Sequence, residues 1–142
     1  MKICIVGAGY VGLVTGVCLA SRGHQVTCVD KNLSIIEKIN LGISPIYEKG
    51  LSELLVKVIS SGNFEATNNL ISALENKSIC IIAVGTPSIE GIIDLRYIES
   101  VSAEIGKYIS NTDRFISVIV KSTVLPGTTK KTVLKKLEES SG

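Results

Sequence analysis

The segment that most constrains this chain is a glycine-rich turn, Gly7-Ala8-Gly9-Tyr10-Val11-Gly12, set between an apolar run and a helix-forming stretch. The run Lys2–Val6 has the composition of a strand buried on both faces. Tyr10–Arg22 carries apolar residues at helical spacing, and Gly23 after it is a helix stop signal. A strand, a turn of spaced glycines and a helix together indicate the start of a βαβ unit.

Each glycine of this turn has its own physical task. Gly7 permits the tight turn out of the strand, and Gly12 lets the helix pack against the sheet. Gly9 has no Cβ to obstruct a pyrophosphate at the helix N-terminus, where free N–H groups and the helix dipole favour an anion. The pattern therefore predicts a dinucleotide site, and the alternative is a glycine-rich turn that binds no ligand.

Short apolar runs alternate with helical stretches along the rest of the chain. Further strands are predicted at Val26–Val29, Phe64–Ala66, Ile79–Val84 and Phe115–Val120. Further helices are predicted at Asn32–Leu41, Leu51–Ser60, Asn68–Glu75, Leu95–Tyr108 and Gly127–Ser140. This alternation predicts a single α/β domain over residues 1–142, a Rossmann-type doubly wound parallel sheet of about five strands with helices on both faces.

An acidic residue, Asp30, closes the second predicted strand, and Lys31 follows it. A carboxylate at this position accepts hydrogen bonds from both ribose hydroxyls of an adenosine and repels the additional phosphate of NADP. The alternative is a helix cap or a solvated turn carboxylate. Lys31 softens the repulsion without removing it, so Asp30 predicts NAD as the cofactor.

Two more turn sequences follow predicted strands. In Val84-Gly85-Thr86-Pro87, the glycine allows close backbone approach, the threonine supplies a hydroxyl and Pro87 stiffens the loop. Lys121-Ser122-Thr123-Val124 supplies two hydroxyls and a cation. Ligands of doubly wound sheets bind outside the carboxyl ends of the strands, so these turns and Asp30 are expected to form one ligand-binding edge. Each turn alone is equally well explained as an ordinary connection.

Composition excludes several classes of function. With 45% hydrophobic and 20% charged residues, the chain is not intrinsically disordered. Fifteen basic and 13 acidic residues leave a net charge of only +2, which does not predict nucleic acid or a membrane surface as partner. No apolar run approaches the ~20 residues of a membrane span, and no side-chain spacing predicts a metal site.

The four cysteines, Cys4, Cys18, Cys28 and Cys80, all lie in apolar stretches and form no CxxC pair. Free cysteine packs as a small hydrophobic residue, so all four are predicted to be reduced core residues. Reduced cysteines indicate a reducing compartment, which favours the cytoplasm. None is predicted as a catalytic thiol, because none lies where a thiolate would be stabilised.

Five motifs in a fixed order resemble the N-terminal domain of the UDP-glucose/GDP-mannose dehydrogenase family, over essentially the whole chain. They are Gly7–Gly12, Val29-Asp30, Ser44-Pro45-Ile46-Tyr47-Glu48, Val84–Pro87 and Lys121–Val124. The resemblance implies an enzyme that oxidises C6 of a nucleotide-activated hexose from alcohol to acid with two NAD molecules. Ile35 departs from the pattern, because the family often has Lys or Arg there; Lys31 is the candidate to replace that charge.

The resemblance also implies roles for individual residues. By matching position, Tyr10 and Val11 would contact the pyrophosphate through their backbone, and Asp30 would hold the adenosine ribose. Thr86 and Thr123 would lie against the cofactor. Thr123 would also help to position the hydrolytic water, which makes it the one catalytic candidate.

In the family, the cysteine nucleophile, the helix that forms the dimer and the domain that binds the nucleotide sugar all follow the region that this chain matches. We therefore expect an N-terminal fragment that binds NAD without turnover, from a longer enzyme that forms a homodimer or larger assembly. The alternatives are a stand-alone dinucleotide-binding regulatory module and another hydride-transfer enzyme, such as a 3-hydroxyacid dehydrogenase. The Lys-Ser-Thr-Val block argues against the latter, and the sugar, UDP-glucose or GDP-mannose, stays open.

Overall fold

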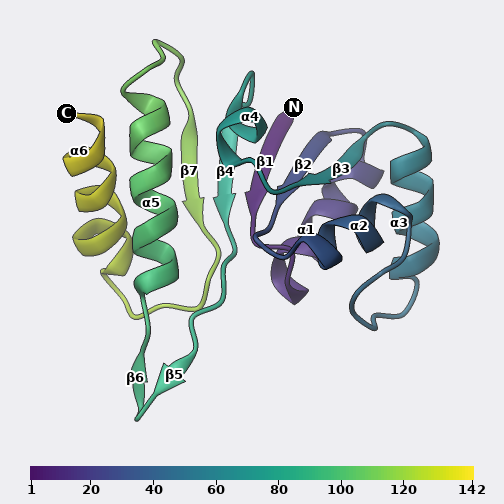
Figure 1. The fold of residues 1–142 in the computed structure, drawn as a ribbon, viewed down its shortest axis with the longest axis horizontal. Helices are drawn as coiled ribbons and strands as arrows, with labels where there is room; N and C mark the ends of the chain where they lie inside the picture. The colour runs from purple at the N-terminus through teal and green to yellow at the C-terminus, as the bar shows by residue number, and fades with distance from the viewer.

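The computed structural model describes all 142 residues and contains a five-stranded sheet in the order β3-β2-β1-β4-β7 (Figure 1). The strands are β1 (Lys2–Val6), β2 (Gln25–Val29), β3 (Phe64–Thr67), β4 (Ile79–Ile82) and β7 (Ser117–Val120). All four neighbouring pairs are parallel, and Ile5 of the central strand β1 lies opposite Cys28 of β2 and Ile81 of β4. The predicted doubly wound parallel sheet is confirmed.

Helices cover both faces of this sheet (Figure 1). One face carries α1 (Tyr10–Ser21), α2 (Leu33–Asn40) and α3 (Leu51–Ser60), and the other carries α4 (Leu70–Leu74), α5 (Arg96–Ile109), the π-helical segment η1 (Thr129–Leu134) and α6 (Lys135–Ser141). Side chains of a strand point alternately to the two faces. Ile3 and Ile5 of β1 accordingly join the core under α1–α3, while Cys4 and Val6 join the core under α4 and α5.

Most helix boundaries follow the predicted signals, but the last predicted helix, Gly127–Ser140, is π-helical over Thr129–Leu134 and α-helical only over Lys135–Ser141. Asn32 caps α2, because its side-chain oxygen accepts hydrogen bonds from the backbone N–H groups of Ser34 at 3.1 Å and Ile35 at 3.4 Å. Gly23 follows α1 with a φ of +87°, the left-handed conformation that ends helices. None of the helices combines the length and apolar character that a membrane crossing requires.

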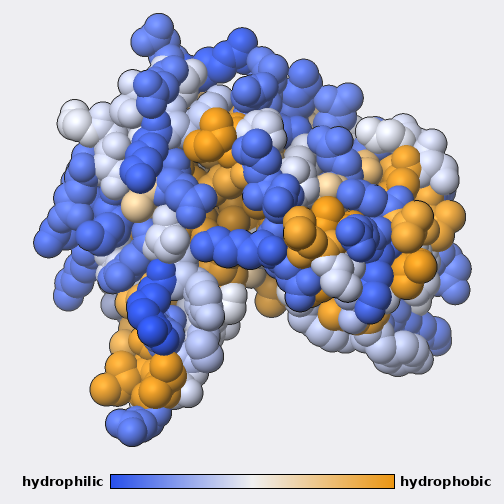
Figure 2. Space-filling view, in the orientation of Figure 1, coloured by the Kyte–Doolittle hydropathy of each residue, from blue (hydrophilic) through white to orange (hydrophobic).

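A short antiparallel hairpin, β5 (Ser88–Ile89) and β6 (Ile92–Ile93), was not predicted. Two-residue strands are too short to show a periodic pattern, and the turn between them, Glu90-Gly91, takes positive φ at both positions. The hairpin projects beyond the sheet in Figure 1, and an apolar patch covers this projection in Figure 2. Ile89 and Ile92 are both exposed.

The prediction that all four cysteines lie in the core is wrong for Cys18. Cys4, Cys28 and Cys80 are buried, whereas Cys18 is exposed. Cys18 lies two helical turns after Val11 in α1 and therefore on the same face, and Val11 is also exposed. The buried face of α1 is formed instead by Leu13, Val17 and Ala20.

Candidate cofactor-binding site

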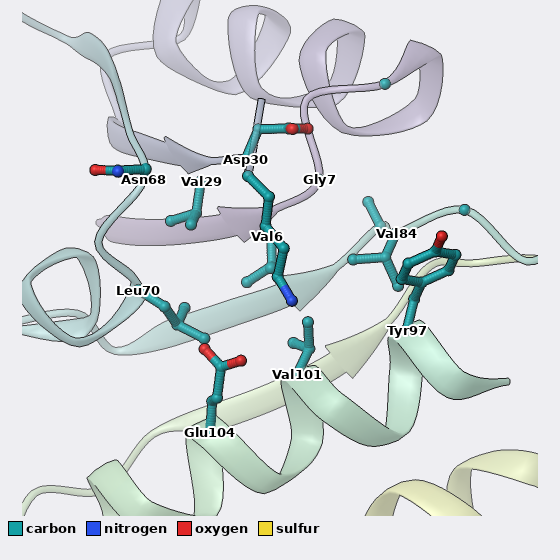
Figure 3. Close-up of a pocket in the computed structure, with 14 residues that line it drawn as sticks. Val6, Gly7, Val29, Asp30, Asn68, Leu70, Val84, Tyr97, Val101 and Glu104 are labelled. Carbon is teal, nitrogen blue, oxygen red and sulfur yellow. The ribbon is translucent and has the colours of Figure 1, made fainter. Parts of the chain in front are cut away.

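A cavity of about 310 Å³ lies at the carboxyl edge of the sheet, next to the ends of β1, β2 and β4 (Figure 3). The chain runs from β1 outward to β3 on one side and from β4 to β7 on the other, so the strand order reverses between β1 and β4. Such a reversal point is where doubly wound sheets bind ligands. The lining residues are Val6, Gly7, Gly9, Val29, Asp30, Lys31, Asn68, Leu70, Ala83, Val84, Gly85, Tyr97, Val101 and Glu104.

The three glycines of the turn differ in what surrounds them. Gly7 has a φ of +106°, and a Cβ on it would lie 2.6 Å from the Ala83 carbonyl oxygen. A Cβ on Gly12 would lie 1.8 Å from the carbonyl oxygen of Gly7. A Cβ on Gly9 would have no atom within 4 Å. The fold itself therefore requires Gly7 and Gly12, whereas the open space at Gly9 fits a ligand that comes close to the backbone.

The Asp30 carboxylate is held rigidly beside this turn. One oxygen accepts a hydrogen bond from the Ala8 backbone N–H at 2.8 Å, and the other accepts from the Asn32 N–H at 2.9 Å. Each carboxylate oxygen has a second lone pair, so both can still accept from a ribose hydroxyl. Sequence reasoning placed Asp30 at the end of β2 but did not reveal the bond to Ala8, which couples the carboxylate to the glycine turn.

The turns after β4 and β7 are tied to each other. The Ser122 hydroxyl donates to the Val84 carbonyl oxygen at 2.7 Å, and the Thr86 hydroxyl donates to the Thr123 carbonyl oxygen at 2.8 Å. The Thr123 side chain is exposed and its hydroxyl makes no hydrogen bond within the chain. The two predicted turns therefore do meet at one edge, with two of their three hydroxyl protons bound to backbone.

Tyr10 makes a contact that the sequence did not predict. Its hydroxyl lies 2.8 Å from the Tyr47 carbonyl oxygen and 2.5 Å from a carboxylate oxygen of Glu48. The hydrogen bond to Glu48 raises the pKa of Tyr10, because it stabilises the protonated phenol. The side chain thus fastens the loop that carries the Ser44–Glu48 motif to the first turn of α1.

The structure distributes the predicted cofactor residues around the cavity unevenly. Lining it directly are Gly7, Gly9, Asp30, Lys31 and Gly85. Outside its lining are Tyr10, Val11, Gly12, Thr86, Pro87, Ser122 and Thr123, in the adjoining turns and the start of α1. Sequence reasoning missed the residues of the opposite wall, above all Tyr97, Val101 and Glu104 of α5. Their spacing along one helix face is the signal that could have grouped them.

The buried cysteines do not offer a nucleophile. Burial raises the pKa of the Cys28 thiol, and a hydrogen bond with Cys4 together with burial raises that of Cys80 well above its ordinary range. Thiols with a raised pKa stay protonated, and the thiolate is the reactive form. Cys28 and Cys80 are therefore unsuited to act as nucleophiles.

A glycine turn at a helix N-terminus, a fixed carboxylate at the end of β2 and a cavity at the reversal point define a dinucleotide-binding domain of the Rossmann type. The chain belongs to the UDP-glucose/GDP-mannose dehydrogenase family, whose NAD binding domain matches residues 1–142. The open space at Gly9 and the free lone pairs of Asp30 fit this cofactor.

Curated relatives and solved structures agree with this assignment. The chain is 46% identical to the GDP-mannose 6-dehydrogenase of Pseudomonas putida, covering 100% of this chain and 33% of the relative. It is 44% identical over 130 residues to the UDP-glucose 6-dehydrogenase of Rhizobium meliloti, covering 90% of this chain and 29% of that one. A ternary-complex crystal structure of GDP-mannose dehydrogenase from Pseudomonas aeruginosa matches all of this chain and 33% of that one, with a TM-score of 0.98 and 43% identity. The chain therefore spans about a third of the length of these relatives.

Proposed function

We propose that this chain is the cofactor-binding domain of a larger nucleotide-sugar 6-dehydrogenase, with GDP-mannose as the first candidate substrate. The observation that carries the proposal is the cavity at the reversal point, with open space at Gly9 and a fixed carboxylate at Asp30. GDP-mannose is favoured because the GDP-mannose 6-dehydrogenases among the relatives match over the full chain at 43% to 46% identity. UDP-glucose is the second candidate, supported by the relative from Rhizobium meliloti.

NAD, when bound, supplies the hydride acceptor. The residues of this chain bind and orient it. Backbone N–H groups at the start of α1, including those of Tyr10 and Val11, would bind the pyrophosphate, for which Gly9 leaves room. Asp30 would accept hydrogen bonds from the adenosine ribose, and Gly85 would allow the cofactor to approach the backbone closely at the end of β4. The free Thr123 hydroxyl at the end of β7 is the group that would position a hydrolytic water.

The wider setting of the enzyme is part of the proposal. Four free cysteines, three of them buried, fit a reducing compartment such as the cytoplasm. The family resemblance supports a homodimer or larger assembly of the whole enzyme, built through parts that this chain does not contain. The nucleotide sugar would likewise be bound mainly outside these residues.

Two measurements test the proposal. Calorimetry on this chain should show NAD binding and weaker NADP binding, and the chain alone should release no NADH with GDP-mannose or UDP-glucose. The complete gene product should release NADH with one of the two sugars. If the complete product binds NAD but oxidises neither sugar, both substrate candidates fail; if it oxidises no nucleotide sugar at all, the proposal fails in favour of a regulatory dinucleotide-binding module. Turnover by the 142-residue chain alone would show that the catalytic groups have been misplaced.

A further inference from the structure

The cavity continues past Asp30 into a slot with apolar walls. Leu70 of α4 and Val101 of α5 line this end together with Val29 of β2. Figure 3 shows the Glu104 side chain reaching from α5 toward Leu70, with its carboxylate at the far end of the slot from Gly7. A half-buried carboxylate therefore stands at the end of the slot, beside its apolar walls.

The Glu104 carboxylate has no strong partner within the chain. Its one hydrogen bond comes from the Ser100 hydroxyl at 3.5 Å, the outer limit for such a contact. None of the salt bridges involves it, and Lys31, the one cation lining the cavity, lies too far away to form one. An ionised carboxylate only accepts hydrogen bonds, so Glu104 presents free acceptor positions to the slot.

The position of the slot decides what part of the cofactor meets this carboxylate; this step rests on the proposed function. With the pyrophosphate at Gly9 and the ribose at Asp30, the base must lie on the side of Asp30 away from the glycine turn. Leu70 and Val101 are suited to the flat faces of a base. The polar rim of adenine carries an exocyclic amino group, which is a donor.

We propose that Glu104 is a specificity-determining residue that selects adenine by accepting a hydrogen bond from its exocyclic amino group. Hypoxanthine carries a carbonyl oxygen at that position, so two acceptors would face each other there, and its neighbouring N1–H could reach the carboxylate only if the base shifted in the slot; we expect hypoxanthine to bind more weakly. Asn68, at the same end of the cavity, has an exposed side-chain amide that can donate or accept, and it does not discriminate between the two bases.

The test compares NAD with nicotinamide hypoxanthine dinucleotide, which differs only at the base. Calorimetry on the unaltered chain should show a preference for NAD of about tenfold or more, the size expected for one hydrogen bond to a charged group. Glu104→Gln should weaken the binding of NAD and strengthen the binding of the hypoxanthine analogue, because the amide of glutamine can donate to the carbonyl oxygen of hypoxanthine. Glu104→Ala should weaken NAD and leave the analogue within about threefold of its original affinity, a shift below ~0.7 kcal/mol.

Glu99→Gln is the matched control, because it removes the same charge from the same helix outside the cavity lining, and it should keep the original preference. Unchanged discrimination in Glu104→Gln, with NAD still bound, would overturn the role of Glu104 alone. If the Glu104 variants lost affinity for both dinucleotides equally, Glu104 would have a structural role instead. Failure of the unaltered chain to bind NAD at all would instead overturn the proposed function. Circular dichroism confirms that each variant is folded.

Discussion

Replacing Gly9 and Gly12 separately by alanine distinguishes a glycine kept for the ligand from a glycine kept for the fold. Gly9 has φ −72° and ψ −170°, a backbone conformation open to any residue, and its Cβ would have no atom within 4 Å. Gly9→Ala should therefore leave stability unchanged or raise it by up to about 1 kcal/mol, because alanine restricts the unfolded chain.

Gly12→Ala should behave in the opposite way. Its Cβ would lie 1.8 Å from the Gly7 carbonyl oxygen, so helix and turn would have to separate by more than an ångström. Overpacking of this kind costs about 1–3 kcal/mol, and here the neighbour is backbone, which cannot swing aside. Alanine gains about 1 kcal/mol of helix propensity over glycine, too little to offset the clash. At the upper end of the overpacking cost, ~3 kcal/mol, this leaves a net loss of about 2 kcal/mol.

The two variants are compared by urea unfolding and by NAD calorimetry. Gly9→Ala should bind NAD at least about tenfold more weakly, since its Cβ would stand where the pyrophosphate approaches. Gly106→Ala is the control for stability alone: its Cβ would lie 2.8 Å from the Leu137 carbonyl oxygen, between α5 and α6 and away from the cavity. It should lose stability while the folded protein keeps its NAD affinity. If Gly9→Ala bound NAD with the affinity of the unaltered chain, the reasoning that Gly9 leaves room for the ligand would be refuted.

Three further predictions concern single side chains. Asp30→Ala should weaken NAD binding by about 1–3 kcal/mol in calorimetry and narrow the preference over NADP; an unchanged affinity would reduce Asp30 to a turn residue. Tyr10 should ionise above the ordinary tyrosine pKa in an absorbance titration read against Tyr10→Phe, and Glu48→Gln should bring it back down. The hydrogen bond stabilises the folded protein fully at a pH below the pKa of Tyr10 in the unfolded chain. This stabilisation disappears as the pH rises through the higher pKa of Tyr10 in the folded protein. Ser122→Ala should cost about 0.5–1.5 kcal/mol in urea unfolding through loss of its bond to Val84, and no loss would show that the tie is unimportant.

The glycine turn and Asp30 could be predicted because their signals are local. A strand, three glycines and a helix lie within one stretch of sequence, and the carboxylate follows the next strand directly. The inward face of α5 was also readable, since Ile98, Val101 and Ile105 repeat at helical spacing and are all buried. The sequence could not predict which residues of α5 line the cavity, because that depends on how the helix crosses the ends of β1 and β4.

The wrong prediction that Cys18 of α1 is buried has a definite physical cause. The helix is apolar nearly all round, so large apolar residues do not distinguish its buried side. Glycines mark that side instead: a Cβ on Gly16 would lie 2.8 Å from the Phe64 ring and 3.2 Å from Ile5. In a helix that packs this closely on a sheet, the smallest residues identify the contact, and Val11 and Cys18 are left exposed.

The Lys121–Val124 block shows how adjacent hydroxyl residues can divide structural and chemical work. The motif offers two hydroxyls at the sheet edge, Ser122 and Thr123, and the family resemblance singles out Thr123 as the catalytic candidate. In the structure, the Ser122 hydroxyl donates a hydrogen bond to the Val84 carbonyl oxygen, which joins the ends of β4 and β7. The Thr123 carbonyl oxygen accepts a hydrogen bond from the Thr86 hydroxyl. These two bonds fix the backbone on which the Thr123 side chain stands, while its hydroxyl has no partner in the chain. A free hydroxyl on a fixed backbone is suited to orient a ligand or a water, which supports the catalytic role that the family resemblance gives to Thr123 and not to Ser122.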